Sequence, residues 1–323
     1  MSKTHIFHHT DTDGHLAGFL ARRLNNSHEN NVSYIFHAIN YGWKFPLDEI
    51  DADDKVVIVD FTLDVSDMTA LMGKISQHKN IVWIDHHKSA IEKYEKDLPA
   101  ALEVVPGVRY IGLCGAMLTW IYFSSNRSDE DYVIRDDEFI QEKAKVAPAV
   151  VKLVNDHDVW DYRYGETTAY FQTYVRSQDS TPESGFWDDY DYSDSNSDMT
   201  KPISDSMLLL CTSHGKIMTE YKRAWEADYV KKMSFEADFH GYNCLVVNTA
   251  LANMSFFDSV KDPKYDIYIT FSFNGESYNY SLYSETVDVA KLAEKYGGGG
   301  HRGAAGFRTP KLIWPERICR KKN

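Results

Sequence analysis

Three short apolar segments of the sequence are each followed at once by acidic or imidazole side chains. These side chains are His9, Asp11 and Asp13 after the first segment, Asp60 after the second, and Asp85, His86 and His87 after the third. Carboxylate and imidazole groups without cysteine suit Mn²⁺ or a similar divalent ion better than a structural zinc. Concentrated carboxylates also repel one another unless a cation is bound. The pattern therefore predicts a metal centre.

The elements that would position these groups are strands of a parallel sheet. The first half of the chain alternates short apolar runs with helical segments, which predicts an α/β domain whose sheet is covered on both faces. Such sheets bind ligands at the carboxyl ends of their strands, so the three groups are expected to meet at one edge. The i, i+2, i+4 spacing within the first group places its side chains on one side of an extended segment. A fourth group follows a predicted helix and consists of Asp156, His157 and Asp158.

The four groups hold more ligands than one ion needs. Two ions about 3.5–4 Å apart would use them, and such pairs are typical of phosphoester hydrolysis. Simpler interpretations exist for single residues, since Asp60 could cap the helix that follows its strand. His8 is expected to alternate into the core, and Trp160 to pack beneath the site. The coincidence of four groups favours the metal centre.

Composition and charge limit the partners of this protein. The 323-residue chain has a formal net charge of −13 at pH 7, and its length suggests two domains. Long duplex DNA is an unfavourable partner, because non-specific binding depends on cations that neutralise phosphates. The sequence shows no membrane-spanning run and no secretory signal, which predicts a cytoplasmic protein with no membrane partner. Its four scattered cysteines predict neither disulfides nor a zinc knuckle.

The second half of the chain predicts a smaller α/β domain. An acidic segment at 181–206 is interpreted as an exposed loop, and helix and strand signals follow it. The chain then reaches "GGGGHRGAAGF", residues 297–307. Glycines let backbone N–H groups approach phosphate oxygens, although a helix end followed by a tight turn would also use them. The expected divisions are 1–180, a connection at 181–235, and 236–323.

Five motifs in this order resemble those of the DHH phosphoesterase superfamily. They are "HTDTDG", "VVIVDF", "IDHH", "VNDHDVW" and the glycine-rich "GGGGHRGAAGF", which is similar to the motif of the accompanying DHHA1 domain. The segment around residues 281–307 looks closest to the NrnB-like branch of oligoribonucleases and cyclic-nucleotide phosphodiesterases. The resemblance implies a parallel-sheet DHH domain, a smaller C-terminal α/β DHHA1 domain, and an active site in the cleft between them.

The resemblance also implies roles for the residues that match the motifs. His9 and Asp11 would hold one Mn²⁺ ion, Asp13, His86 and Asp156 would hold a second, and Asp60 would bridge both. Asp158 is an alternative to Asp156, and Mg²⁺ or Co²⁺ are alternatives to Mn²⁺. Asp85 would orient His86, as metal-bound imidazoles usually require, and His87 would face the scissile phosphate or its leaving oxygen. The implied substrate-binding residues are Gly298, Gly299, Gly300, His301, Arg302 and Tyr283, where Tyr283 replaces an arginine of some relatives.

These features together predict a metal-dependent phosphodiesterase. The expected reaction is exonucleolytic hydrolysis of short single-stranded oligoribonucleotides by a water activated between two ions. Alternative substrates are cyclic dinucleotides, their linear products or 3′-phosphoadenosine 5′-phosphate. An alternative of another class is a nucleotide-binding protein that has lost catalysis. The sequence does not decide between a monomer and a homodimer.

Overall fold

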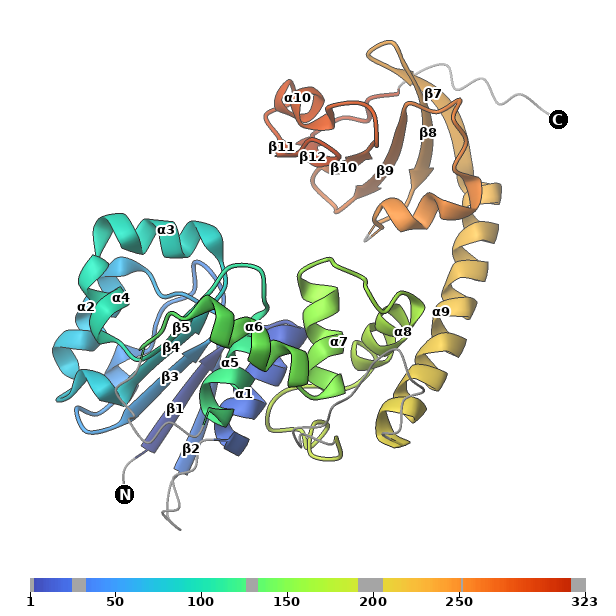
Figure 1. Cartoon of the computed structure of the whole chain (residues 1–323). Helices are drawn as coiled ribbons and strands as arrows, with labels where there is room; N and C mark the ends of the chain where they lie inside the picture. The colour runs from blue at the N-terminus through green and yellow to red at the C-terminus, as the bar shows by residue number, and fades with distance from the viewer. Residues whose placement is uncertain (1–2, 25–32, 126–132, 191–205, 251, 315–323) are drawn as a thin grey trace. The chain divides into compact units, whose positions relative to one another are not determined.

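The structure is a computed structural model that describes residues 3–24, 33–125, 133–190, 206–250 and 252–314 (Figure 1). The chain divides into two compact units, Met1–Thr219 and Glu220–Asn323. The division falls inside the helix α9, which spans Ser206–Met233. Among the described residues, no helix combines the length and the apolar character that crossing a bilayer would require.

The first unit contains a six-stranded sheet in which every neighbouring pair of strands is parallel. The strand order is β2-β1-β3-β4-β5-β6. The strands are β1 (Lys3–His8), β2 (Ser33–Ala38), β3 (Lys55–Val59), β4 (Ile81–Asp85), β5 (Gly107–Arg109) and β6 (Val133–Ile134). The expected α/β domain with a parallel sheet is therefore confirmed.

Helices and short 3₁₀ segments connect these strands. They are α1 (Thr12–Leu24), η1 (Leu47–Glu49), α2 (Val65–Lys74), η2 (His78–Asn80), α3 (Lys88–Asp97), α4 (Pro99–Val104), α5 (Gly115–Ser124), α6 (Asp137–Val146), α7 (Ala149–Asp158) and α8 (Glu166–Val175). Alternate residues of the central strands point to two different apolar clusters. Val57 and Val59 pack with residues of α1, α5 and α7, whereas Val56 and Ile58 pack with residues of α2, α3 and α4. Both faces of the sheet are thus covered, which explains the continuous apolar runs.

The register of the sheet brings three strand ends together. Val59 pairs with His8 of β1 on one side and with Ile84 of β4 on the other. The amide of Asp60 donates to the carbonyl of Ile84 at 2.9 Å. The residues that follow these paired positions therefore lie side by side at the carboxyl edge.

Three sequence-based expectations differ from the structure. The apolar pattern of residues 143–160 predicts one helix that ends in a polar turn, but the chain forms α6 and α7 with Pro148 between them, because proline has no N–H and restricts the residue before it. The pattern that follows the acidic segment predicts a helix as far as residue 238, but α9 ends at Met233 and β7 begins at once. The acidic segment is not uniformly exposed, since Trp187 and Tyr190 are buried; its residues 191–205 lie outside the described part of the chain.

The second unit contains a mixed six-stranded sheet, with β8 and β9 parallel and the other neighbours antiparallel. Its order is β11-β12-β10-β9-β8-β7. The elements are β7 (Ser234–Phe239), β8 (Tyr242–Asn248), η3 (Met254–Val260), β9 (Ile267–Phe273), β10 (Tyr278–Tyr283), α10 (Val289–Glu294), β11 (Gly299–His301) and β12 (Ala304–Thr309). One face packs with α10 in an aromatic-rich cluster, and the other packs with η3. A second α/β domain is therefore present, as expected.

Candidate metal centre

The first group of candidate ligands consists of His9, Asp11 and Asp60, whose donor atoms lie within 4.8 Å of one another. His9 Nδ1 lies 2.8 Å from Asp11 Oδ2 and 3.8 Å from Asp60 Oδ2. The amide of Gly14 donates to Asp11 Oδ1 at 2.9 Å in the first turn of α1. Burial acts to raise the pKa of Asp11, but the bonds from His9 and Gly14 outweigh it and lower that pKa. The loop between β1 and α1 therefore holds this carboxylate in its charged form.

The second group consists of Asp13, His86 and Asp158. His86 Nε2 lies 3.6 Å from Asp158 Oδ2 and 3.8 Å from Asp13 Oδ2. The amides of Gly115 and Ala116 donate to the Asp13 carboxylate at 2.6 and 2.8 Å, so the N-terminus of α5 fixes this side chain. Burial, followed by repulsion from Asp13 and Asp11, raises the pKa of Asp158 to about 8.

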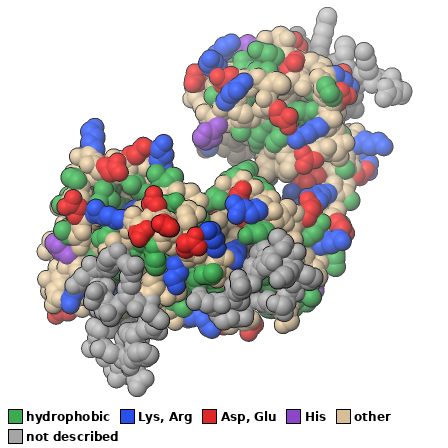
Figure 2. Space-filling model, in the orientation of Figure 1, with side chains coloured by type: hydrophobic (Ala, Val, Ile, Leu, Met, Phe, Trp, Pro, Cys, Tyr) green, Lys and Arg blue, Asp and Glu red, His purple; other side chains and the backbone are tan. Residues whose placement is uncertain are grey.

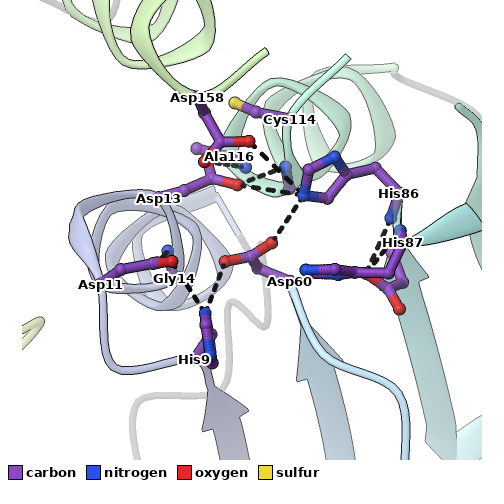
Figure 3. Close-up of polar contacts among 12 residues, drawn as sticks. His9, Asp11, Asp13, Gly14, Asp60, His86, His87, Cys114, Ala116 and Asp158 are labelled. Carbon is purple, nitrogen blue, oxygen red and sulfur yellow. Dashed lines mark hydrogen bonds and ion pairs between the residues drawn. The ribbon is translucent and has the colours of Figure 1, made fainter. Parts of the chain in front are cut away.

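Asp60 lies between the two groups (Figure 3). Its Oδ2 faces His9, and its Oδ1 lies 3.1 Å from His86 Nε2. The residue is buried and has a φ of +54°, a conformation that L-residues rarely adopt. Asp60 does not cap a helix, because α2 begins five residues later and neither carboxylate oxygen accepts a hydrogen bond from the described residues. Burial and the neighbouring carboxylates of Asp13 and Asp11 raise its pKa well above the usual range.

The arrangement fits divalent cations. A buried carboxylate without hydrogen bonds is unfavourable unless a cation compensates it. The other donors are carboxylates and imidazoles, which suit Mn²⁺ and related ions. Because each Asp60 oxygen faces a different group, two ions could share this residue. Donor atoms from all four segments therefore lie close together. The extended spacing expected for His9, Asp11 and Asp13 is not present, because β1 ends at His8 and Asp13 lies in the first turn of α1, where it joins the second group.

Asp156 does not belong to either group. Its carboxylate accepts hydrogen bonds from the amides of Arg163 at 2.7 Å and Tyr164 at 3.2 Å, and from the hydroxyl of Thr168. It therefore holds the loop between α7 and α8, and its oxygens are already satisfied. The preference for Asp156 is not supported by this geometry, and Asp158 takes its place. Asp158 comes two residues later, which on a helix turns the side chain to another face.

Asp85 orients His87 rather than His86. Asp85 Oδ1 lies 2.7 Å from His87 Nδ1 and also accepts the amide of His86 at 2.7 Å. Its Oδ2 accepts the hydroxyl of Thr62. Burial acts to raise the pKa of Asp85, but the bonds from His87 and Thr62 outweigh it and lower that pKa. With Nδ1 engaged in this bond, His87 has Nε2 available to other groups.

The glycine-rich segment of the second unit combines a helix end with a tightly packed strand. Gly297 has a φ of +75°, and the amides of Gly297 and Gly298 donate to carbonyls in the last turn of α10, as in a Schellman motif. A Cβ on Gly298 would lie 2.1 Å from the carbonyl oxygen of Gly306, and one on Gly300 would lie 2.6 Å from the Cα of Ala305. A Cβ on Gly299 would meet nothing within 4 Å. The positive φ therefore accounts for Gly297 and close packing accounts for Gly298 and Gly300, whereas neither accounts for Gly299.

The other expected substrate-binding residues differ in their surroundings. His301 and Arg302 are exposed. The hydroxyl of Tyr283 donates to the carbonyl of Ala252 at 2.6 Å, and its ring packs against the cluster beside η3. A hollow of about 470 Å³ lies beside Gly298, and Arg308 contributes to its lining. The segment therefore carries one exposed guanidinium at Arg302, and Arg308 places another at the recess. Figure 2 shows how cationic and acidic side chains are distributed over one face of the molecule.

Sequence reasoning overlooks several residues that shape the centre. Gly115 lies outside the five motifs and Thr62 directly follows "VVIVDF", and only the fold shows that they lie against Asp60 and Asp85 respectively. His8 is buried as expected, whereas Trp160 is 76% exposed and does not pack beneath the site. Tyr41 lies beside His9 and His87. An aromatic residue in a polar loop is the only sequence signal that could have indicated it.

Comparison of sequences finds a distant relative. The chain matches no protein-family model. An uncharacterized protein of Acanthamoeba polyphaga mimivirus is 24% identical over 283 residues, a match that covers 83% of this chain. The chain spans 56% of the length of that relative.

Comparison of structures finds similar chains at low sequence identity. The DHH domain of a member of a family of ribosomal proteins is 13% identical, with 94% of this chain and 82% of that chain covered and a TM-score of 0.49. The pGpG-specific phosphodiesterase PggH from Vibrio cholerae is 12% identical, with 96% and 94% covered and a TM-score of 0.43. RecJ from Thermus thermophilus in complex with Mn²⁺ is 9% identical, with 94% and 49% covered and a TM-score of 0.38. At these identities and TM-scores, the similarity to solved structures assigns no chemistry to this chain.

Proposed function

We propose that the protein is a DHH-type phosphodiesterase that uses two divalent cations to hydrolyse short oligoribonucleotides. The observation that carries this proposal is the Asp60 carboxylate, which is buried and has no hydrogen bond from the described residues, with one oxygen toward each group of ligands. The order of the five sequence motifs supports the same assignment.

The ligands divide between two ions. His9 and Asp11 would hold one ion, Asp13, His86 and Asp158 would hold the other, and Asp60 would contact both. When bound, such ions supply an activated water and neutralise charge on the phosphoryl oxygens. Mn²⁺ is the ion we propose, with Mg²⁺ and Co²⁺ as alternatives, since the ligand set mixes carboxylates and imidazoles.

His87 is proposed to act on the substrate directly. Asp85 accepts a hydrogen bond from Nδ1 and so fixes the ring. The Nε2 atom can then donate to a phosphoryl oxygen or to the oxygen that leaves. A positioned donor of this kind stabilises charge that develops during the reaction.

The size of the substrate follows from charge. A chain with a net charge of −13 does not attract a long duplex. A short strand needs only local positive groups, which the ions and Arg302 would provide, with the His301 ring as a further hydrogen-bond donor. We propose that the glycine-rich segment binds the terminal phosphate, with Gly299 as the position open to close approach.

The direct test is hydrolysis of an end-labelled pentaribonucleotide with Mn²⁺. The expected result is a ladder that shortens by one nucleotide at a time and is absent for Asp60→Ala. The matched control is Asp64→Ala, because Asp64 follows the same strand but is exposed and makes no helix-cap bond. Failure of the metal-loaded protein to cleave this RNA would exclude an oligoribonuclease. Cleavage of cyclic dinucleotides or 3′-phosphoadenosine 5′-phosphate instead would assign the alternative substrates.

A further inference from the structure

Two exposed aromatic side chains lie on the segment that follows β2, and this segment spans residues 39–45. Tyr41 is 52% exposed and Trp43 is 57% exposed. The residues at the two ends of the segment, Ile39 and Phe45, are buried. Lys44 is exposed next to Trp43. The segment is therefore held at both ends while its centre presents two aromatic rings and a cation to solvent.

Hydrogen bonds attach this segment to the loop that carries His9. The amide of Ile39 donates to the carbonyl of His8 at 3.0 Å. The side chain of Asn40 donates to the hydroxyl of Thr10 at 3.2 Å and accepts from the amide of Tyr41 at 2.8 Å. The position of Tyr41 is consequently fixed relative to the first group of ligands.

The ring of Tyr41 borders the metal centre directly. Its centroid lies 6.2 Å from that of His9 and 6.0 Å from that of His87, which it meets edge to face. The ring packs on Phe61, the residue after Asp60, with centroids 4.8 Å apart. These contacts support the ring from the protein side, and half of the residue still faces solvent. Figure 3 shows His9 on the side of Asp60 away from Asp158. Because the Tyr41 ring neighbours His9, it lies on the side of the first group of candidate ligands.

We infer that Tyr41, with Trp43 and Lys44 beside it, is the platform on which a nucleobase stacks next to the scissile phosphate. Proteins that bind single strands combine exposed aromatic rings with cations in this way, because every base has a π-face. Single exposed apolar residues are common on proteins. A ring that packs on Phe61 beside His9 and His87, with a second exposed ring two residues away in the chain, is more specific. The inference rests on the proposed function, and it adds that the substrate carries a base on the His9 and His87 side of the cleaved bond.

The first test compares variants on normal and abasic substrates. Tyr41→Ala should raise KM for a pentaribonucleotide about 5- to 150-fold, the range that stacking of one base provides. Its kcat should change little, and Tyr41→Phe should restore KM because it keeps the ring. The increase should disappear when one defined position of the RNA lacks its base. An unchanged KM for Tyr41→Ala would overturn the inference, as would an increase that persists with every abasic substrate.

The second test does not depend on cleavage. A dinucleotide that contains 5-iodouridine and a hydrolysis-resistant linkage is irradiated with the wild-type protein in Mn²⁺, and the crosslinked peptide is identified by mass spectrometry. Attachment to Tyr41 or Trp43 is the expected result. If the wild-type protein cleaves no RNA, the proposed function fails, and this crosslink alone decides whether the platform binds a base. Absence of a crosslink on residues 39–45 would overturn the inference.

Discussion

Gly115 and Asp60 are so close that a methyl group on Gly115 would lie 2.4 Å from the Asp60 Cβ and 2.8 Å from its Cγ. Gly115 is the first residue of α5, and its amide also donates to Asp13. One residue therefore sets the positions of two candidate ligands that belong to different groups. This relationship makes the centre sensitive to a substitution at a residue that is not itself a candidate ligand.

Gly115→Ala should displace Asp60 and lower the affinity for Mn²⁺ at least tenfold. The added methyl has no free space, so the protein should also lose about 1–3 kcal/mol of stability. The matched control is Gly73→Ala in α2, where a Cβ would meet nothing within 4 Å. Isothermal titration calorimetry with Mn²⁺ on both folded variants measures the difference. Equal affinities for Gly115→Ala and the wild type would show that Asp60 does not need its present position.

Asp158→Asn should change metal binding, whereas Asp156→Asn should change stability. Asp158→Asn should weaken Mn²⁺ binding without destabilising the metal-free protein, because it removes repulsion with Asp13. Asp156→Asn should cost about 2–4 kcal/mol in urea unfolding, because an amide cannot accept every bond that its carboxylate accepts. Loss of Mn²⁺ binding by a stable Asp156→Asn protein would reverse this assignment.

Removal of metal should lower the melting temperature of the wild type. Saturation at one hundred times the dissociation constant adds about 2.7 kcal/mol, which corresponds to roughly 5–11 °C for a unit of this size. Asp60→Asn should show no such shift with Mn²⁺. Without metal it should melt above the wild type, since a buried carboxylate without hydrogen bonds has been replaced. Differential scanning calorimetry with and without a chelator gives both values, and an equal Mn²⁺ shift in the two proteins would refute the role of Asp60.

Two substitutions in the glycine-rich segment should distinguish its role in folding from its role in substrate binding. Gly298→Ala should destabilise the protein by about 1–3 kcal/mol, because its Cβ would collide with β12. Gly299→Ala should fold normally, since the space around it is open. If the segment binds a phosphate, Gly299→Ala should still raise KM for RNA. Thermal melting and steady-state kinetics of the two variants distinguish these effects, and normal stability of Gly298→Ala would contradict the packing account.

Much of the fold could be predicted because local patterns agree with the final architecture. The apolar runs before Asp60 and Asp85 become β3 and β4, and the parallel register then places both residues at one edge. Pro148 shows the limit of reasoning from periodicity, because the apolar pattern continues through it although the helix does not. Trp187 and Tyr190 lie in an acidic segment and are nevertheless buried, since tertiary packing outweighs local composition.

The site could be predicted to the level of residue groups but not of single partners. Asp156 and Asp158 are both carboxylates in one motif, and only the direction of α7 decides which faces His86. The same applies to Asp85, whose neighbours His86 and His87 are equivalent in sequence, while the geometry pairs it with His87. Contacts such as that of Gly115 with Asp60 depend on segments that are far apart in the chain.

The most direct measurement of the central claim is anomalous diffraction from a crystal soaked in Mn²⁺. The account predicts two peaks, one beside His9 and Asp11 and the other beside Asp13, His86 and Asp158, with an oxygen of Asp60 next to each. A single peak, or two peaks that do not share Asp60, would contradict it.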